Sequence, residues 1–207
     1  MIENFLVNST VTHAPVFVDE LEDKVITDVI LGDKFPWYWQ NYQILDDDET
    51  TKNKLPVKLR DHITFHNGPF LGHSLLRRAI SETEKYTERP IDHTSIYWRM
   101  FLEIFDRFTI ENNIKYTNIF RANLNLTWYN SDVHTAPHLD HEWPHNNFIM
   151  YLTDCTDGET IIWPDDFSTS YLVKCKKYTA VTFKHQWHAQ RYPALGTKRI
   201  AFVLTYI

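Results

Sequence analysis

Histidines gather in the C-terminal third of the chain, where one of them forms a His-x-Asp pair. Six of the 11 histidines lie between positions 134 and 188. His138 and Asp140 are separated by one residue, so on a β-strand their side chains project from the same face. An imidazole and a carboxylate held side by side can occupy two adjacent positions around a metal ion. The pair by itself is equally consistent with a hydrogen-bonded histidine and aspartate at a strand end.

A second histidine from a distant strand would complete a 2-His-1-carboxylate facial triad, which leaves three positions around the metal open. The predicted strand at 179–183 leads directly toward His185 and His188. At this point the spacing leaves both His185 and His188 open as the third ligand.

Arg199 stands at the head of the last apolar strand, 199–206. A guanidinium in that position is costly to bury unless it has an anion to hold. Its planar fork suits a carboxylate, which it can bind through two parallel hydrogen bonds. A metal triad and a buried arginine are the smallest set of groups that can bind a 2-oxo dicarboxylate. One end of the molecule would bind the metal, and the other would bind the arginine.

The segments that carry these residues show the period of two that is typical of β-strands. In 121–129, Ala122, Leu124, Leu126 and Trp128 alternate with polar residues, so the two sets lie on opposite faces. The same alternation recurs at 147–153, and short strands are predicted at 160–163, 171–174, 179–183 and 199–206. We expect Tyr151 and Arg199 to point into the molecule. The opposite faces carry Phe148, Met150 and Phe202, which we expect to pack on helices.

The first half of the chain predicts helices at about 16–32, 71–85 and 94–112, with an aromatic cluster at 35–39. Helices followed by a run of short strands indicate an α+β, mainly β fold. We expect one domain over 1–207. Its residues 1–114 would supply helical support and aromatic packing, and residues 115–207 an antiparallel barrel with the metal site.

Composition narrows the possible partners and compartment. The net charge of −6 and the lack of a basic stripe disfavour nucleic acid as a partner. No apolar run reaches the ~18 residues of a membrane span, and the start is not a signal peptide, so we expect a cytoplasmic protein. Cys155 and Cys175 have no metal-binding spacing and are expected to be free thiols unless the fold packs them together. Composition does not indicate an oligomeric state.

The motifs that carry a resemblance stand in this order: His138-x-Asp140, Tyr151-Leu-Thr153, Asp157-Gly-Glu-Thr160, Val181-Thr-Phe183, His188 and Arg199-Ile-Ala-Phe202. This order resembles the Fe(II)- and 2-oxoglutarate-dependent dioxygenases and is most similar to their prolyl-4-hydroxylase-like branch. The matching part runs from about 121 to 207. The aromatic cluster at 35–39, followed by His66, is similar to small phage-encoded members, for which the compartment would be the host cytoplasm.

The resemblance implies a double-stranded β-helix (jelly-roll, cupin-like) core with flanking N-terminal helices. It also implies Fe(II) held by His138, Asp140 and His188, where His188 is preferred over the competing His185 because it has the better distance from both Phe183 and Arg199. The implied cosubstrates are 2-oxoglutarate and O2, with ascorbate as an open addition. The implied reaction hydroxylates a C–H bond of a peptidyl, including prolyl, or small-molecule substrate and releases succinate and CO2.

Residues for the cosubstrate also follow from the resemblance. Arg199 matches the arginine that binds the far carboxylate, and Tyr151 matches a tyrosine that reaches the same molecule. Asn123 and Asn125 lie on the polar face of the preceding strand, and one of them is expected to contact the cosubstrate. Thr205 shares the face of Arg199 and is a further candidate.

Two other functions fit parts of the pattern. The segment from His138 to His141 overlaps the His-x-His-x-Asp-His signature of metallo-β-lactamase-like zinc hydrolases, but Ala136 stands where that signature needs its first histidine. A jelly-roll or cupin-like barrel can also be a binding or structural module without activity. Against that second reading stands the coincidence of the triad order with an arginine at the head of the last strand.

Overall fold

Two antiparallel sheets make up most of the computed structural model, which describes residues 5–8, 11–41, 52–53, 55–60, 68–77, 94–130 and 134–207. In spatial order the larger sheet consists of β1 (Phe5–Asn8), β2 (Val11–Pro15), β9 (Thr179–Lys184), β6 (Asn146–Tyr151), β11 (Lys198–Tyr206), β5 (Ile119–Trp128), β4 (Phe70–Leu76) and β3 (Tyr38–Gln40). The smaller sheet consists of β10 (His188–Gln190), β7 (Thr160–Ile162) and β8 (Tyr171–Val173).

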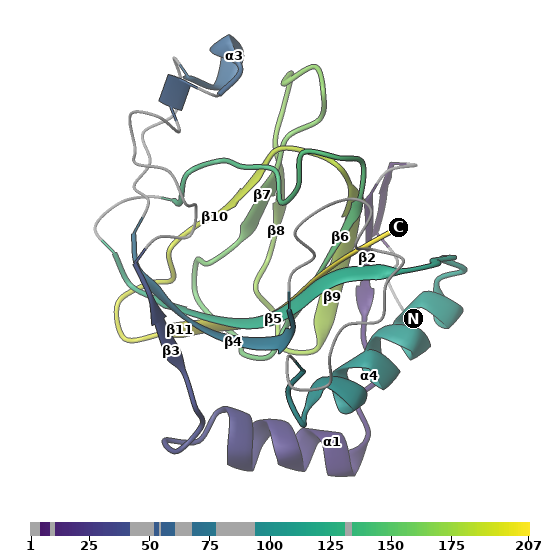
Figure 1. The fold of residues 1–207 in the computed structure, drawn as a ribbon. Helices are drawn as coiled ribbons and strands as arrows, with labels where there is room; N and C mark the ends of the chain where they lie inside the picture. Colours follow the sequence, from purple (N-terminus) through teal and green to yellow (C-terminus); the bar gives the residue numbers. More distant parts are fainter. Residues whose placement is uncertain are drawn as a thin grey trace.

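The two sheets face each other as in a jelly-roll (Figure 1). Side chains of β6, β9 and β11 meet those of β7 and β8 in one buried apolar cluster between the sheets. Isolated bridges at His134↔Arg191 and His138↔His188 place the segment before β6 beside β10, at the edge of the smaller sheet. The predicted mainly β, jelly-roll core with flanking N-terminal helices is confirmed.

Period-two alternation separates the two faces of the larger sheet, as predicted. On β5, Ala122, Leu124 and Leu126 lie in the main hydrophobic core. The residues between them, Asn123 and Asn125, face the smaller sheet and are only partly buried. A strand that is apolar on one face and polar on the other must turn its polar face toward the interior when the other sheet covers it.

The helices at 20–30 and 98–111 cover the outer face of the larger sheet (Figure 1). Helix α4 (Trp98–Glu111) falls within the predicted 94–112. Helix α1 (Glu20–Val25) continues into the π-helical turn η1 (Ile26–Ile30) and begins later than predicted. Asp19 caps it, because the side chains of Asp19 and Glu22 each accept the other's backbone N–H at 2.9 Å. Val16 instead donates its N–H to the carbonyl of Tyr178 at 2.8 Å, which holds it beside the sheet.

The helix predicted at 71–85 is wrong within the described part of the chain, because residues 70–76 form strand β4. Leu71, Leu75 and Leu76 fit a helical stripe as well as a strand, and a short apolar run does not separate the two. Pairing with β5 on one side and β3 on the other decides the conformation. The N-terminal half therefore contributes strands β1 to β4 to the larger sheet. The prediction that residues 1–114 supply helical support and aromatic packing left these strands out. Residues 78–93 lie outside the described residues.

The expectation of free thiols is also wrong. Cys155 and Cys175 form a disulfide with their Cα atoms 5.6 Å apart, and no free cysteine remains. The two residues follow β6 and β8, which belong to different sheets. Their proximity comes from the facing of those sheets, and a separation of 20 residues in the sequence does not reveal it.

Aromatic rings fill the space between α4 and the larger sheet. The ring of Phe101 lies 4.7 Å from that of Phe202, and the rings of Phe105 and Phe108 each lie 5.0 Å from that of Phe148. These centroid distances are those of edge-to-face and tilted aromatic pairs. The predicted packing of Phe148, Met150 and Phe202 on the helices is confirmed.

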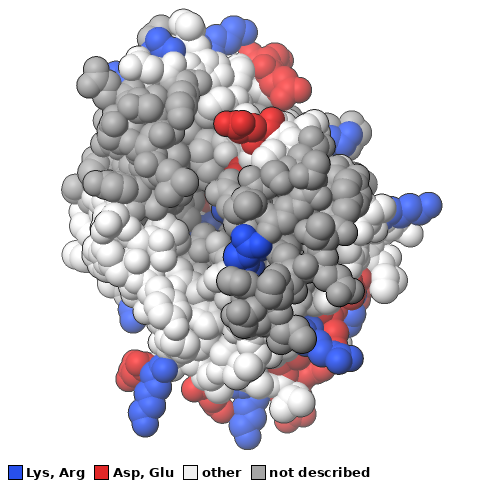
Figure 2. Space-filling view, in the orientation of Figure 1, with Lys and Arg blue, Asp and Glu red and all other residues white. Residues whose placement is uncertain are grey.

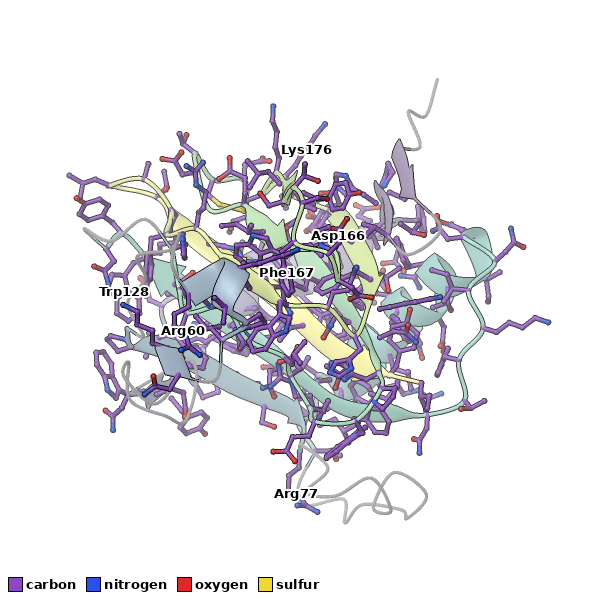
Figure 3. All side chains as sticks on the ribbon, turned by 90° about the horizontal axis from the view of Figure 1, so that it is seen from above. Arg60, Arg77, Trp128, Asp166, Phe167 and Lys176 are labelled. Carbon is purple, nitrogen blue, oxygen red and sulfur yellow. A yellow bond between two sulfur atoms is a disulfide. The ribbon has the colours of Figure 1, made fainter. Side chains whose placement is uncertain are left out.

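A small apolar cluster lies at one end of the barrel. Helix α3 (Val57–Arg60) buries Leu59 there against Ile161 of β7, Ala189 of β10 and Trp163, which directly follows β7. Lys58 of α3 donates to the carbonyl of Asp166 at 3.0 Å. Figure 3 shows the molecule from above, with Arg60 of α3 and Phe167 lying over the strands. None of the helices in the described ranges is long and apolar enough to cross a membrane.

The aromatic layer under α4 should account for a large share of stability. We expect Phe105→Ala to lower the free energy of unfolding by about 3–5 kcal/mol, because the ring is fully buried and leaves a cavity. Ile110→Ala on the same helix is the control, since this side chain is 76% exposed and should change stability by no more than ~0.5 kcal/mol. Urea unfolding of both variants tests this. Equal effects of the two changes would contradict the packing described.

Candidate metal centre

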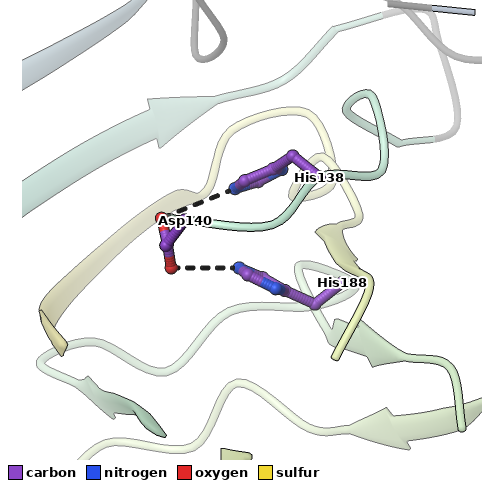
Figure 4. A group of neighbouring side chains, drawn as sticks. All are labelled: His138, Asp140 and His188. Atoms are coloured by element: carbon purple, nitrogen blue, oxygen red, sulfur yellow. Dashed lines mark ion pairs between the residues drawn. The ribbon is translucent and has the colours of Figure 1, made fainter. Parts of the chain in front are cut away.

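His138, Asp140 and His188 come together at the edge of the smaller sheet (Figure 4). One potential ligand atom from each lies within 4.8 Å of the other two. Nε2 of His188 is 3.4 Å from Oδ2 of Asp140, and Nε2 of His138 is 3.9 Å from Oδ1. Asp140 and His188 are buried, while His138 is partly exposed. The structure thus assembles the three residues for which the sequence predicts metal ligation.

A reciprocal backbone bridge holds the two histidines next to each other. The N–H of His138 donates to the carbonyl of His188 at 2.9 Å, and the N–H of His188 donates back at 3.1 Å. The imidazole rings consequently lie 4.4 Å apart between centroids. Residues 50 positions apart in the sequence meet because β10 begins at His188, opposite the segment that precedes Asp140.

Local hydrogen bonds fix which nitrogen of each histidine carries the proton. Nδ1 of His138 lies 3.0 Å from the carbonyl of Ala136, and Nδ1 of His188 lies 3.0 Å from the carbonyl of Gln186. A carbonyl only accepts, so Nδ1 donates and Nε2 keeps its lone pair toward Asp140. Backbone carbonyls commonly orient metal-ligating histidines in this way. Burial and the neighbouring His188 lower the pKa of His138 to about 4, which leaves it neutral near pH 7.

Arg121 is a part of the centre whose role the sequence did not reveal. Its Nη2 donates to Oδ1 of Asp140 at 2.5 Å, and both side chains are largely buried. Burial on its own would raise the pKa of Asp140, but the positive charge of Arg121 holds this pKa well below its usual range. With Oδ1 bound to Arg121, Oδ2 is the oxygen left facing His188. The alternation in the sequence placed Arg121 on the inward face of β5, but it did not indicate which residue Arg121 pairs with.

Arg199 is a buried cation with neutral partners. It is 2% exposed and donates to the carbonyl of Gly158 at 3.0 Å, to Oε1 of Gln190 at 2.6 Å and to Oγ1 of Thr160 at 3.2 Å. Its guanidinium carbon lies 5.2 Å from the centre of the Tyr151 ring. Burial lowers the pKa of Arg199. Among the described ion pairs none involves Arg199, so its charge lacks the counter-charge that buried ions usually have.

Tyr151 points into the interior as predicted. Its hydroxyl lies 2.7 Å from Oγ1 of Thr160 and donates to the carbonyl of Val173 at 3.3 Å. Burial raises the pKa of Tyr151, although Arg199 and Thr160 act in the opposite direction. The phenol is therefore neutral beside Arg199 and can donate a hydrogen bond.

The neighbours of Arg199 across the sheet carry polar atoms without a partner. Thr127 pairs with Arg199 in the β5–β11 register, and Asn125 pairs with Ala201. Oγ1 of Thr127 and Oδ1 of Asn125 are buried and lack a hydrogen-bond partner among the described residues. Nε2 of Gln190 is also buried and lacks a partner among these residues. Thr127 and Gln190 were not among the predicted site residues, although the alternation on β5 placed Thr127 on the inward face.

The other predicted residues lie farther from Arg199. Asn123 pairs with Val203, two positions along β11 beyond the partner of Asn125. Thr205 is six residues from Arg199, about 20 Å along an extended strand. It shares a hydrogen bond of 2.8 Å with Nε2 of His141. The structure does not bring Thr205 to the arginine.

His185 lies outside the triad. Its Nε2 donates to the carbonyl of His141 at 3.1 Å, and its ring lies 4.6 Å from that of His145. His66, which contributed to the resemblance to phage-encoded members, is outside the described residues. That resemblance stays a prediction.

Comparison with solved structures identifies the architecture. The chain is similar to an oxidoreductase of the 2OG-Fe(II) oxygenase family from Burkholderia pseudomallei, with a TM-score of 0.66, 14% identity, and coverage of 97% of this chain and 86% of that chain. It is also similar to a prolyl hydroxylase from Trichoplax adhaerens, with a TM-score of 0.55, 11% identity, and coverage of 98% and 85%. The chain has the fold of the 2OG-Fe(II) oxygenases.

A third solved structure shares this fold. The non-heme α-ketoglutarate-dependent carbocyclase SnoK from nogalamycin biosynthesis aligns with a TM-score of 0.56 and 10% identity, over 98% of this chain and 81% of that one. No family model and no curated protein sequence matches the chain. The likeness to the 2OG-Fe(II) oxygenases is therefore one of structure, with very little sequence identity.

Metal binding tests the triad directly. We expect His138→Ala, Asp140→Ala and His188→Ala each to weaken Mn(II) or Fe(II) binding by more than ~100-fold, since losing even an outer-shell partner costs about 10–100-fold. His185→Ala is the matched control and should keep nearly full affinity. Anaerobic calorimetric titration measures both. Loss of binding in His185→Ala but not in His188→Ala would show that the third ligand is misassigned.

The Arg121–Asp140 pair should matter for stability. We expect Arg121→Leu to lower the free energy of unfolding of the metal-free protein by about 3 kcal/mol, because a buried carboxylate loses its counter-charge. Arg99→Leu is the control: Arg99 pairs with Glu103 on the surface and is 89% exposed, so its loss should cost under ~0.5 kcal/mol.

Saturating Mn(II) should shrink the deficit of Arg121→Leu, since the cation takes over as counter-charge of Asp140. Urea unfolding with and without Mn(II) measures this change. A deficit that Mn(II) leaves untouched would indicate that Arg121 stabilises the fold independently of Asp140.

Proposed function

We propose that this chain is an Fe(II)- and 2-oxoglutarate-dependent oxygenase that hydroxylates a C–H bond of a peptidyl, including prolyl, or small-molecule substrate, with release of succinate and CO2. One observation carries the proposal. A His-Asp-His triad and a buried arginine that has no counter-charge among the described residues face the interior of the same jelly-roll. Each has a simple use in holding a metal-chelating dicarboxylate, and the fold is the one in which such sites occur.

The donor set of the triad fits ferrous iron. Two neutral imidazole nitrogens and one carboxylate oxygen form the ligand set of non-heme Fe(II) oxygenases, and they leave positions open for other molecules. Bound Fe(II) with 2-oxoglutarate would supply O2 activation coupled to oxidative decarboxylation. The chain itself holds the Nε2 lone pairs of His138 and His188 toward one point, and Arg121 restrains Asp140.

The surroundings of Arg199 fit the far carboxylate of 2-oxoglutarate. A carboxylate there would provide the missing counter-charge and accept further hydrogen bonds from the guanidinium. Oγ1 of Thr127 has no hydrogen-bond partner among the described residues and can donate to the same group. Asn125 is the asparagine nearer to Arg199 in the strand register, so we assign it, rather than Asn123, to the cosubstrate. Ile149 and Ala201, on the inward faces of β6 and β11, belong to the buried apolar cluster between the sheets, so water would screen a charge pair there only weakly.

Charge and likeness to other structures guide the choice of substrate class. The similar prolyl hydroxylase was solved in complex with a peptide fragment, which supports a peptidyl substrate. SnoK, a carbocyclase, supports a small molecule equally well. On the face drawn in Figure 2, basic and acidic side chains of the described residues are interspersed, which with a net charge of −6 disfavours nucleic acid.

Three further predictions are untested by the structure. Ascorbate is left out of the proposal, because no described residue distinguishes it. The single domain over 1–207 and the cytoplasmic location stay predictions from the sequence.

Binding of 2-oxoglutarate to the Mn(II)-loaded protein tests the role of Arg199. Arg199→Lys keeps the charge but loses the fork, so we expect a loss of ~1–3 kcal/mol in 2-oxoglutarate binding. Arg199→Met should nearly abolish binding while Mn(II) affinity stays unchanged, because the arginine does not belong to the triad. Calorimetry measures both affinities, and circular dichroism shows that each variant is folded.

Turnover without a prime substrate gives a second readout. The wild type should slowly form succinate in a reaction that needs Fe(II) and O2, and N-oxalylglycine should block it competitively. If Arg199→Met keeps wild-type succinate formation, Arg199 is a structural residue. If the wild type neither turns over nor binds 2-oxoglutarate with any metal, the jelly-roll is a binding module without this activity.

A further inference from the structure

The disulfide lies directly against a residue that anchors Arg199. The carbonyl of Gly158 accepts a hydrogen bond from Nε of Arg199 at 3.0 Å. A Cβ atom added to Gly158 would lie 2.6 Å from Sγ of Cys155, 3.5 Å from Cδ of Arg199 and 3.7 Å from Cβ of Cys175. Gly158 thus separates the disulfide from the stem of the arginine, and there is no room at this position for even a methyl group.

A tight turn at 155–158 carries this anchor. Asp157 and Gly158 both have positive φ, of 58° and 74°, a conformation that glycine adopts without steric cost. Sγ of Cys155 lies 3.5 Å from the carbonyl oxygen of Asp157, and the N–H of Ala194 donates to the carbonyl of Thr156 at 2.9 Å. The conformation of this turn decides where the carbonyl of Gly158 points.

The disulfide also adjoins the other groups around Arg199. Thr160, two residues after Gly158, accepts from Nη2 of Arg199 at 3.2 Å, and its Oγ1 lies 2.7 Å from the hydroxyl of Tyr151. Cys175 belongs to the buried apolar cluster that contains Tyr151, and Cys155 packs against that cluster. A change at the disulfide would therefore reach the acceptors that orient the guanidinium.

Reduction of the disulfide would displace the turn. Two thiols in contact lie roughly 1.5 Å farther apart than two bonded sulfur atoms, so the sulfurs must separate. Cys175 is only 6% exposed, and Sγ of Cys155 is already in contact with Gly158. The turn is the part that can yield, because Thr156 and Asp157 are exposed. Its displacement would move the carbonyl of Gly158 away from Nε of Arg199.

We propose that Cys155 and Cys175 form a thiol–disulfide exchange site that controls the affinity of the Arg199 region for 2-oxoglutarate. The disulfide form holds Arg199 in the orientation that binds the cosubstrate, and the dithiol form binds it more weakly. This inference rests on the proposed function, because it concerns the binding of 2-oxoglutarate at Arg199.

The reactant is a dithiol, either a small molecule or a protein. Its thiolate attacks Sγ of Cys155, which is the more exposed of the two cysteines. The S–S bond breaks, and its electron pair passes to Sγ of Cys175, which takes up a proton. The second thiol of the reactant then displaces Cys155 from the mixed disulfide. The protein gains two electrons and two protons, and the reactant becomes a disulfide.

Calorimetric titration of the Mn(II)-loaded protein with 2-oxoglutarate tests the proposal. One sample of wild type is disulfide-bonded, and the other is reduced with dithiothreitol and then desalted under argon. We expect reduction to weaken 2-oxoglutarate binding about ten-fold, the effect of one hydrogen bond to a charged group. Mn(II) affinity should stay unchanged, because the backbone bridge between His138 and His188 holds the triad.

The double variant Cys155→Ser/Cys175→Ser is the matched control. It should bind 2-oxoglutarate as weakly as the reduced wild type, and treatment with dithiothreitol should not change its affinity. Equal affinities of oxidised and reduced wild type, or tighter binding by the reduced form, would overturn the proposal. So would a folded protein whose disulfide dithiothreitol does not open. Loss of the circular dichroism spectrum on reduction would show that the disulfide is purely structural.

The coupling between the two sites must be reciprocal, which gives a second readout. If the disulfide form binds ten-fold more tightly, saturating 2-oxoglutarate lowers the midpoint potential of the cysteine pair by about 30 mV. Equilibration of the Mn(II)-loaded protein in dithiothreitol redox buffers, followed by alkylation and mass spectrometry, measures this shift. A midpoint that 2-oxoglutarate leaves unchanged would contradict the proposal, since a merely structural disulfide predicts that result.

The outcomes separate this inference from the proposed function. If the disulfide-bonded wild type does not bind 2-oxoglutarate, both the oxygenase proposal and this inference fail. If it binds 2-oxoglutarate with an affinity that reduction does not alter, only the exchange site is overturned, and the oxygenase proposal stands.

Discussion

The backbone bridge between His138 and His188 is the constraint on which the site depends. Two mutual hydrogen bonds, of 2.9 and 3.1 Å, fix the Cα positions of both histidines. A carbonyl two residues before each histidine then fixes its ring. No side chain has to be held at the end of a flexible stem, so both lone pairs converge without a metal to organise them. The sheet that contains β10 is small, but this bridge ties it to the segment leading into β6.

The two buried arginines of the interior differ in whether a carboxylate neutralises their charge. Asp140 has its counter-charge in Arg121, and the pair can persist in the absence of any ligand. Within the described part of the chain, Arg199 has only neutral acceptors and the face of Tyr151, so burying it costs stability that a bound anion would restore. Proteins tolerate such local violations of the rules of burial mainly at functional sites. The difference between the two arginines is thus a stronger indication of function than either residue alone.

Much of this arrangement could be predicted from the sequence, because the strands alternate so regularly. The inward faces of Tyr151 and Arg199 and the outward face of Phe202 follow from a period of two. Leu71, Leu75 and Leu76 have no such unambiguous period, and their strand depends on pairing with β5. The contacts of Cys155 with Cys175 and of Arg121 with Asp140 arise where distant segments meet, and spacing along the chain carries no information about them.

The two ends of the interior differ in the kind of molecule they favour. Toward Arg199 the unpaired groups surround a cation, so the complementary molecule is an anion. Around Asn147 the groups without a partner among the described residues are uncharged, and Arg121, two strands away in the register, is paired with Asp140. An anionic molecule would therefore be drawn toward Arg199 rather than toward Asn147 by electrostatics.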